Sequence, residues 1–316
     1  MNCLPTVLAH SLTDQVQQKK WLIDQLWTRG GVGIIGGEPK CCKSFLALSM
    51  AISVSSGVSC LGRYEVHSSG RVVLYAAEDA PHIVKGRLDG IAKYNNLELK
   101  NLDIHIINVP VLRLDKESEQ IRLKETIAKL QPKLLILDPF VRLHRIDENS
   151  SGEVAPILAA LREIQRSFQT AIAVVHHSKK SSGSGRAGQA LRGSSEFHAW
   201  GDVNLYLRRN KNDNLSLSIE HRDAKSQAGI PLELTEIDSS VILKTTTDEE
   251  SNSKSTLTDK IFEIFESSDS CLSLEEVRVK VRARSSNVCK AIKSLLDNGQ
   301  LEKVAGGYKK YGSLIN

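Results

Sequence analysis

Residues 37–44 read GEPKCCKS and nearly fit the phosphate-binding pattern G-x-x-x-x-G-K-[ST]. Backbone N–H groups of such a turn surround a phosphate, helped by the N-terminus of the helix that follows. Lys43 would supply positive charge to the outer phosphates, and the Ser44 hydroxyl would be a ligand for Mg²⁺. We therefore expect a nucleoside triphosphate site whose contacts are Gly37, Glu38, Pro39, Lys40, Cys41, Cys42, Lys43, Ser44 and Phe45.

Cys42 departs from the pattern because it stands where glycine is expected. Glycine is favoured there because the turn bends into backbone angles that a side chain resists. Cysteine is small, so we expect a strain of about 1 kcal/mol and a turn that still forms. The alternative interpretation is a chance match at a glycine-rich turn before a helix.

Asp138 ends the segment KLLILD, in which four apolar residues run into an acid. The carboxyl ends of parallel strands are where open α/β sheets bind their ligands. Asp138 is therefore expected to hold Mg²⁺ through water beside Ser44. The alternative is an acid that only begins a turn after a buried strand.

Glu78 follows an apolar strand predicted for residues 71–77, so its carboxylate would emerge at the same edge of the sheet. A carboxylate there can act as general base on a water molecule. The alternative is an exposed acid that caps the helix starting at Pro81, a task for which Asp79 is the better candidate.

The elements that would position these residues alternate between apolar strands and amphipathic helices. Strands are predicted at 71–77, 103–109, 133–138 and 171–177, and helices at 43–56, 81–94, 118–130 and 152–168. This alternation favours an α/β fold with a mostly parallel sheet and helices on both faces. Four more strands follow without helices between them, and we expect an antiparallel extension of the sheet at 202–207, 215–222, 231–237 and 241–244.

The composition is that of an ordinary globular protein: 316 residues, a net charge of +5 and 41% hydrophobic residues. The mildly basic charge permits an anionic partner without demanding one. We find no run of about 18 apolar residues and no secretory pattern at the N-terminus, so we expect a cytoplasmic protein without a membrane partner. The six cysteines form no CxxC pair, which argues against zinc and redox motifs.

A polar stretch at 245–255 has the composition of a linker between two domains, 1–244 and 256–316. The C-terminal domain is predicted to hold three helices and a hairpin, with Ser273 and Glu276 forming a capping box. It resembles a winged helix-turn-helix domain. Its excess of basic residues suits the backbone of duplex DNA, and Arg284 and Lys290 are the candidate contacts. A contact with protein is the alternative.

Three segments carry a more specific resemblance: LDPFVRLH at 137–144, ENSSG at 148–152 and VVHHSKK at 174–180. With these segments, the region 20–245 resembles the RepA-type hexameric helicase ATPases of plasmids and related RecA-like ATPases of bacteria and mobile elements. The resemblance implies a RecA-like P-loop NTPase core that uses ATP and Mg²⁺. It also implies a homo-oligomer such as a hexamer, with single-stranded DNA in a central channel.

The resemblance assigns roles to individual side chains. Glu78 matches the catalytic glutamate that orients the attacking water. His177 matches the polar residue that senses the γ-phosphate, with His176 as the second choice. The alternative for His177 is a surface residue at the end of a strand.

The loop 178–193 matches the mobile loop that lines the channel of ring-shaped relatives. Its basic residues Lys179, Lys180 and Arg186 would contact DNA phosphates without reading sequence. A solvated loop without a function is the alternative.

Ring-forming relatives complete each site with an arginine from the neighbouring subunit. The lysine-x-arginine pair of DnaB-type rings falls on Glu220 and Arg222, so the arginine matches and the lysine does not. Arg222 is the first candidate for this catalytic role and Arg192 the second. An ordinary ion pair made by Arg222 is the alternative.

These observations favour a ring-forming ATPase that acts on DNA, such as a helicase or replication ATPase of a plasmid or mobile element. The alternative is a regulator in which ATP sets the oligomeric state and the C-terminal domain binds DNA without unwinding. A scaffold that binds nucleotide without hydrolysing it is a third interpretation.

Overall fold

The computed structural model describes residues 4, 6–11, 21–177, 196–209, 214–237, 240–246, 257–268, 271–281, 285–304 and 306–311. The chain divides into two compact units, Met1–Thr245 and Thr246–Asn316. Among the described residues, every helix is too short or too polar to span a lipid bilayer.

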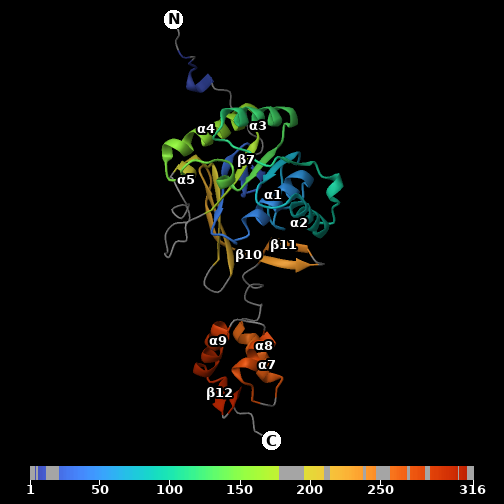
Figure 1. Ribbon diagram of the computed structural model, residues 1–316, viewed down its shortest axis with the longest axis vertical. Coiled ribbons are helices and arrows are strands. Elements are labelled where there is room, and N and C mark those ends of the chain that lie inside the picture. The colour runs from blue at the N-terminus through green and yellow to red at the C-terminus, as the bar shows by residue number, and fades with distance from the viewer. Residues whose placement is uncertain are drawn as a thin grey trace. The chain divides into compact units, whose positions relative to one another are not determined.

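The first unit is built on a nine-stranded sheet with the order β11-β10-β9-β8-β3-β7-β6-β4-β5 (Figure 1). Six strands form a parallel block: β3 (Val32–Gly37), β4 (Val72–Ala76), β5 (Ile104–Ile106), β6 (Leu134–Asp138), β7 (Ala171–His177) and β8 (Val203–Arg209). Three strands extend it in antiparallel fashion: β9 (Leu215–His221), β10 (Gln227–Ile237) and β11 (Ser240–Thr245).

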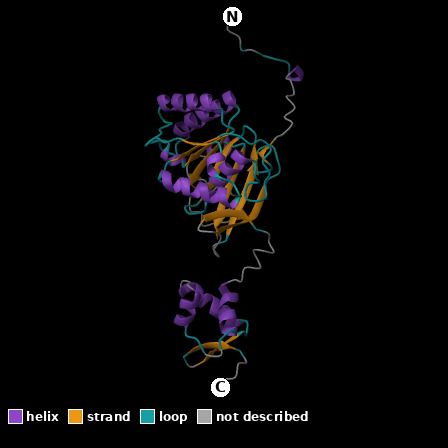
Figure 2. Cartoon of the chain, turned by 90° about the vertical axis from the view of Figure 1, so that its right-hand side faces the viewer, coloured by secondary structure: helices purple, strands orange, loops and turns teal. Residues whose placement is uncertain are grey.

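Helices cover both faces of the sheet (Figures 1 and 2). One face packs against α1 (Lys43–Ser56) and α2 (Pro81–Tyr94). The other face packs against α3 (Glu117–Leu130), α4 (Ser151–Phe168) and α5 (Glu196–Trp200). Successive residues of each buried strand contribute to opposite cores, because side chains alternate along a strand. The fully buried strands of the parallel block therefore read as continuous apolar runs.

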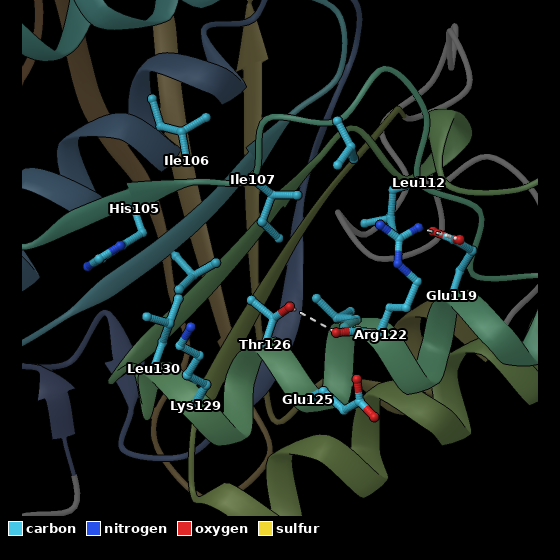
Figure 3. A pocket seen from close by; sticks show the side chains of 13 residues that line it. His105, Ile106, Ile107, Leu112, Glu119, Arg122, Glu125, Thr126, Lys129 and Leu130 are labelled. Carbon is cyan, nitrogen blue, oxygen red and sulfur yellow. Dashed lines mark hydrogen bonds and ion pairs between the residues drawn. The ribbon is translucent and has the colours of Figure 1, made fainter.

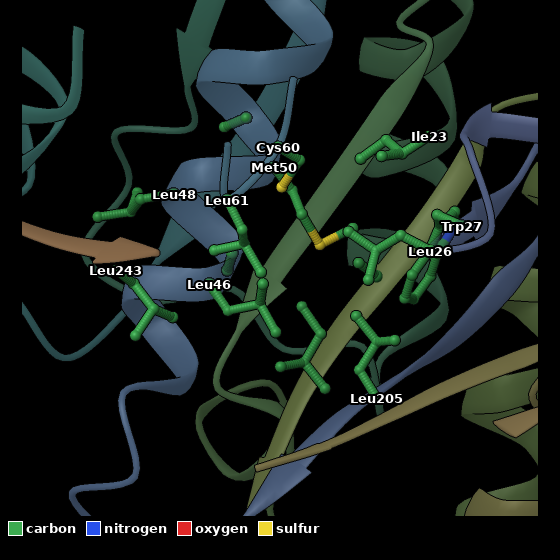
Figure 4. Packing of buried hydrophobic residues seen from close by; sticks show 14 of the residues in the cluster. Ile23, Leu26, Trp27, Leu46, Leu48, Met50, Cys60, Leu61, Leu205 and Leu243 are labelled. Atoms are coloured by element: carbon green, nitrogen blue, oxygen red, sulfur yellow. The ribbon is translucent and has the colours of Figure 1, made fainter. Parts of the chain in front are cut away.

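A short hairpin, β1 (Trp21–Ile23) and β2 (Trp27–Thr28), closes the core around α1 (Figure 4). Trp27 is fully buried and its indole N–H donates to the Gly31 carbonyl at 3.2 Å. Met50 of α1 points toward this hairpin. Burial of such a side chain contributes about 1.5–3 kcal/mol, so the hairpin helps to hold the helix that follows the phosphate-binding turn.

The structure confirms the predicted alternation of strands and helices, and it corrects the direction of one strand. Residues 202–207 were expected to begin the antiparallel extension, but β8 pairs in parallel with β3, from Gly33–Val203 to Gly37–Leu207. The short helix α5 precedes β8 and lies on the face opposite α1. Sequence reasoning missed α5 because five residues carry too little periodicity to be recognised.

The second unit contains α7 (Leu257–Glu266), α8 (Leu274–Val281), α9 (Ser285–Asp297) and the hairpin β12 (Leu301–Val304)–β13 (Gly307–Lys310). Its own core includes Ile261, Phe265 and Val277. The capping box predicted at the second helix is present: the Ser273 N–H donates to Glu276 Oε2 at 2.8 Å, and the Glu276 N–H donates to Ser273 Oγ at 3.3 Å.

Candidate active site

Four neighbouring parallel strands, β3, β7, β6 and β4, have their carboxyl ends side by side, and these ends form one edge of the sheet. The register places Gly37 beside His177 and Ala76 beside Asp138. The Ala77 N–H donates to the Asp138 carbonyl at 2.8 Å. The chain that leaves β4 toward Glu78 therefore runs beside the end of β6. The topology therefore brings the phosphate-binding turn and the three predicted functional residues that follow these strands to one edge.

The turn before α1 has the backbone that a phosphate cradle needs. Lys40 and Cys42 lie in the left-handed region, with φ of 67° and 62°. Left-handed residues in a turn aim successive N–H groups into one concavity, where an anion binds. Cys42 is also the N-cap of α1 and makes no side-chain capping hydrogen bond. Its backbone angles explain why the pattern prefers glycine at this position.

Lys43 lies inside the turn, with only 5% of its surface exposed. Its ammonium donates to the carbonyls of Gly37 at 3.0 Å and Glu38 at 2.8 Å. Burial lowers its pKa, while nearby negative charge, including that of Asp138 and Glu78, raises it. Both carboxylates therefore lie close enough to the Lys43 ammonium for their negative charges to act on it.

Asp138 and Ser44 make the contact expected of two residues that share a metal ion. The Ser44 hydroxyl and the Asp138 carboxyl are hydrogen-bonded, and burial raises the pKa of Asp138 to about 6. That hydrogen bond lowers the pKa, whereas the charge of Glu78 raises it. A hydroxyl and a carboxylate are the oxygen ligands that Mg²⁺ prefers, so these residues fit the ion that the sequence implies.

Glu78 points toward an arginine that follows Asp138 in the chain. Its Oε1 accepts a hydrogen bond from Arg142 Nε at 3.1 Å. The alternative, in which Glu78 or Asp79 caps the next helix, is wrong, because the N-cap of α2 is Ala80 and no side chain caps it. Asp79 instead forms an ion pair with Arg87 of α2, with 2.5 Å between Asp79 Oδ2 and Arg87 Nη1.

Arg209 is a residue of this site that sequence reasoning missed. Its Nε lies 3.4 Å from the Lys40 carbonyl, and its Nη2 lies 3.6 Å from Cys42 Sγ. It reaches the turn because β8 runs parallel to β3 and ends at the same edge. The arginine pair at 208–209, directly after an apolar strand, was the signal, but the expected antiparallel direction would have placed it at the other edge.

Two other predicted residues lie at this edge. Phe45, in the first turn of α1, is half-buried and its ring packs beneath the Arg87 guanidinium at 5.2 Å. His177, at the end of β7, is half-buried. His176 is buried and stacks on the Phe197 ring at 4.2 Å, so it faces the core of α4 and α5 rather than the turn.

Arg222 lies at the edge formed by the amino ends of the parallel strands, whereas Lys43 of the same chain lies at the edge formed by their carboxyl ends. It follows β9, which runs antiparallel to β8, and its N–H donates to the Asp202 carbonyl at 2.9 Å. Its guanidinium donates to the Ala199 carbonyl at 2.6 Å and lies 3.3 Å from the Asp202 carboxylate. Within its own chain Arg222 therefore makes the ion pair weighed as the alternative, and a catalytic role would require a neighbouring subunit.

Several predicted DNA contacts lie outside the described residues: Lys179, Lys180, Arg186 and Arg284, together with Arg192. Lys290 is described and lies exposed on α9.

Asp138→Asn is expected to stabilise the metal-free protein at neutral pH. The raised pKa means that the folded protein binds a proton on the Asp138 carboxylate more tightly than the unfolded chain does. The free energy of unfolding therefore falls as the pH rises from the ordinary aspartate value toward 6. In EDTA, we expect the variant to match the wild type near pH 4 and to exceed it by up to about 3 kcal/mol at pH 7.

Urea denaturation at both pH values measures this difference. Asp115→Asn, which alters an exposed carboxylate, is the matched control. A stability difference that does not change with pH would contradict the buried, raised-pKa environment of Asp138.

A cavity of about 470 Å³ between β5 and α3 is separate from this site (Figure 3). It is lined by apolar residues such as Ile107 and Leu112 and by polar ones such as Thr126 and Lys129. It lies beside the outermost parallel strand, and Lys43, Glu78 and Asp138 do not line it.

A protein-family model described as an AAA domain matches residues 2–183. The chain is also similar to a solved structure described as "The Structure Of A DnaB-Like Replicative Helicase And Its Interactions With Primase", with 16% identity and a TM-score of 0.53. The match covers 68% of this chain and 57% of that one, so this chain spans little more than half of the solved relative. At this identity the likeness concerns the fold, and it confirms the RecA-like P-loop core predicted from the sequence. The winged helix-turn-helix interpretation of the C-terminal unit stays a prediction.

Proposed function

Because the chain belongs to the AAA domain family, we propose that it is a Mg²⁺-dependent ATPase that acts on DNA, with ATP bound at residues 37–45. One observation carries the proposal. The ammonium of Lys43, the carboxylate of Asp138 and the carboxylate of Glu78 meet at one edge of the sheet, beside a turn with left-handed residues. A lysine for the phosphates, an acid for the metal ion and an acid for the attacking water are recurring parts of sites for phosphoryl transfer.

Each side chain has a distinct task in this proposal. The backbone of residues 37–44 holds the phosphates, and Lys43 exchanges its carbonyl acceptors for phosphate oxygens. Ser44, and Asp138 through water, would hold the metal ion, which would supply positive charge to the outer phosphates. Glu78 accepts a proton from the attacking water, and His177 contacts the γ-phosphate from the neighbouring strand.

Arg209 adds a second positive charge to the outside of the turn. A guanidinium there offsets negative charge on bound phosphates, and it contacts the Lys40 carbonyl and the Cys42 sulfur on either side of Cys41. We assign it to nucleotide binding, in the same chain as Lys43. Arg222 is proposed to act across a subunit boundary in a homo-oligomer, such as a hexamer, after leaving Asp202.

DNA is the proposed partner of two regions. Lys179, Lys180 and Arg186 would contact a single strand, and the C-terminal unit would contact duplex DNA as a winged helix-turn-helix domain. The pairing of Leu272 with Tyr308 joins the chain before α8 to the hairpin, which supports this interpretation. Lys290 and Lys293 lie three residues apart on α9, and both are exposed.

Replacing Lys290 and Lys293 together by alanine is expected to weaken binding to duplex DNA of any sequence. Each lysine that neutralises a phosphate releases counterions, so the slope of log affinity against log salt should shrink by about 2. Fluorescence anisotropy with a labelled duplex at several salt concentrations measures this slope. Lys260→Ala, an exposed lysine on α7 of the same unit, should leave it unchanged. An unaltered slope in the double variant would remove α9 from the DNA interface.

The segments LDPFVRLH and ENSSG support a more specific proposal, a replication ATPase or helicase of a plasmid or mobile element. The second candidate is a regulator in which ATP sets the oligomeric state without unwinding. The intrachain ion pair of Arg222 favours this candidate. A strand-displacement assay with a forked duplex separates the two: ATP-dependent displacement supports the helicase, and ATP turnover with DNA binding but no displacement supports the regulator.

A further inference from the structure

One arginine of α2 contacts the chain neighbours of two proposed functional side chains. Phe45 directly follows Ser44 at the start of α1, and Asp79 directly follows Glu78. The guanidinium of Arg87 donates to Asp79 Oδ2 at 2.5 Å and to Asp79 Oδ1 at 3.4 Å. Its Cζ also lies 5.2 Å from the centre of the Phe45 ring. Arg87 therefore links the first turn of α1 to the segment that carries the proposed general base.

Contacts on both sides of Glu78 hold the main chain of the segment that joins β4 to α2. Before Glu78, the Ala77 N–H donates to the Asp138 carbonyl at 2.8 Å. After Glu78, the Asp79 carboxylate is held by Arg87 through both of its oxygens. Glu78 itself is exposed, so its place is set by the main chain on either side rather than by burial in a core.

The two helices behind the guanidinium are packed together. Val84 and Leu88 of α2 are buried in the same core as Leu46, which follows Phe45 on α1. Arg87 lies three residues after Val84, so the two residues are neighbours on the surface of α2. Protein interiors are close-packed and yield little. The distance between Arg87 and Phe45 is therefore set by the core.

The double contact suits the shape of an arginine. A planar guanidinium can donate two hydrogen bonds to a carboxylate while its face lies on an aromatic ring. A lysine ammonium is a compact charge without such a plane, so it can pair with Asp79 but cannot stack on Phe45 in the same way.

We propose that Arg87 is a positioning residue for ATP hydrolysis, which fixes Glu78 relative to Ser44 by holding Asp79 beside Phe45. The inference rests on the proposed function and adds a residue to it. A general base must lie within hydrogen-bonding reach of the water that it deprotonates. A displacement of about 1 Å can lower the rate up to about 100-fold, so a contact that holds the base acts on the rate without touching ATP.

Steady-state ATP hydrolysis by the full chain tests this role in Arg87→Ala. The kcat should fall about ten-fold, because Glu78 is present but is held less firmly. The KM for ATP should stay within about two-fold, because the phosphate-binding turn and Lys43 are unchanged. Arg87→Lys keeps the charge but loses the flat face against Phe45. Its kcat should lie between those of the wild type and Arg87→Ala.

Two combined variants trace the path of the effect. Asp79→Asn added to Arg87→Ala should lower kcat by no more than about two-fold further, because both changes remove the same contact. In single-turnover hydrolysis, Arg87→Ala added to Glu78→Gln should cause no further loss, because the role of Arg87 passes through Glu78.

Lys93→Ala is the matched control, because it breaks another ion pair of α2, the one between Lys93 and Asp89 at 2.7 Å. Its kcat and KM should equal those of the wild type. Thermal unfolding checks that each variant folds. If Arg87→Ala does not fold, Arg87→Lys and Asp79→Asn take its place, and each should lower kcat at an unchanged KM.

A kcat that equals that of Lys93→Ala in every folded variant of Arg87 and Asp79 overturns the inference. A KM that rises at unchanged kcat does the same, as does a full ten-fold loss on top of Glu78→Gln. If one of these is found while hydrolysis still depends on Lys43 and Glu78, Arg87 has no positioning role and the proposed function stands. If the wild type does not hydrolyse ATP, or if Lys43→Ala retains the rate, both fail together.

Discussion

Lys43→Ala is expected to lower kcat for ATP hydrolysis by at least about 100-fold, the cost of removing one preorganised charge from a transition state. The structure gives the physical reason. Lys43 is 5% exposed and held by two carbonyls of the turn, so its charge is fixed at the point where phosphate oxygens would lie. No other described lysine is both buried and at this edge of the sheet. Arg209 contacts the outside of the turn and does not replace it.

Lys85→Ala is the matched control for this variant, because it removes an exposed lysine from α2. Its turnover should equal that of the wild type when released phosphate is followed at saturating ATP. Turnover by Lys43→Ala within about three-fold of that control would show that hydrolysis, if present, occurs elsewhere.

Glu78→Gln is expected to lower the rate of ATP hydrolysis while the affinity for ATP stays nearly unchanged. Glutamine has the same shape and can still accept the hydrogen bond from Arg142, but it cannot take up a proton. General-base catalysis contributes about 10²–10⁴-fold, so kcat should fall by that factor. The affinity for ATP should change by less than about three-fold, because Glu78 does not form the turn.

Binding of a fluorescent ATP analogue and single-turnover hydrolysis measure the two quantities separately. Glu65→Gln, an exposed glutamate outside the site, should alter neither. Equal losses of affinity and turnover in Glu78→Gln would mean that this residue supports the fold of the site rather than the reaction.

The turn, Lys43, Asp138 and Glu78 could be placed from the sequence for a simple reason. Each follows a run of apolar residues, and the ends of neighbouring parallel strands meet at one edge. The position of a residue after a strand therefore locates its side chain without any knowledge of tertiary contacts. The left-handed Cys42 also followed from the pattern, because the motif has glycine there for its backbone angles.

Arg209 and Arg142 could not be placed in this way. The position of Arg209 depends on the direction of β8, and short connections suggested an antiparallel strand where the chain forms a parallel one. The contact of Arg142 with Glu78 depends on a three-residue helix that local periodicity does not reveal. The ion pair of Arg222 arises because β8 and β9 bring Asp202 beside it. All three contacts join residues distant in sequence.

The most direct test of the account is a structure of the chain with Mg²⁺ and a non-hydrolysable ATP analogue. We expect the γ-phosphate beside the Lys43 ammonium, the metal ion bound by the Ser44 hydroxyl and through water by Asp138, and an ordered water within hydrogen-bonding distance of Glu78. A triphosphate bound away from residues 37–45, or a metal ion held without Ser44 and Asp138, would contradict the assignment of this edge as the site of hydrolysis.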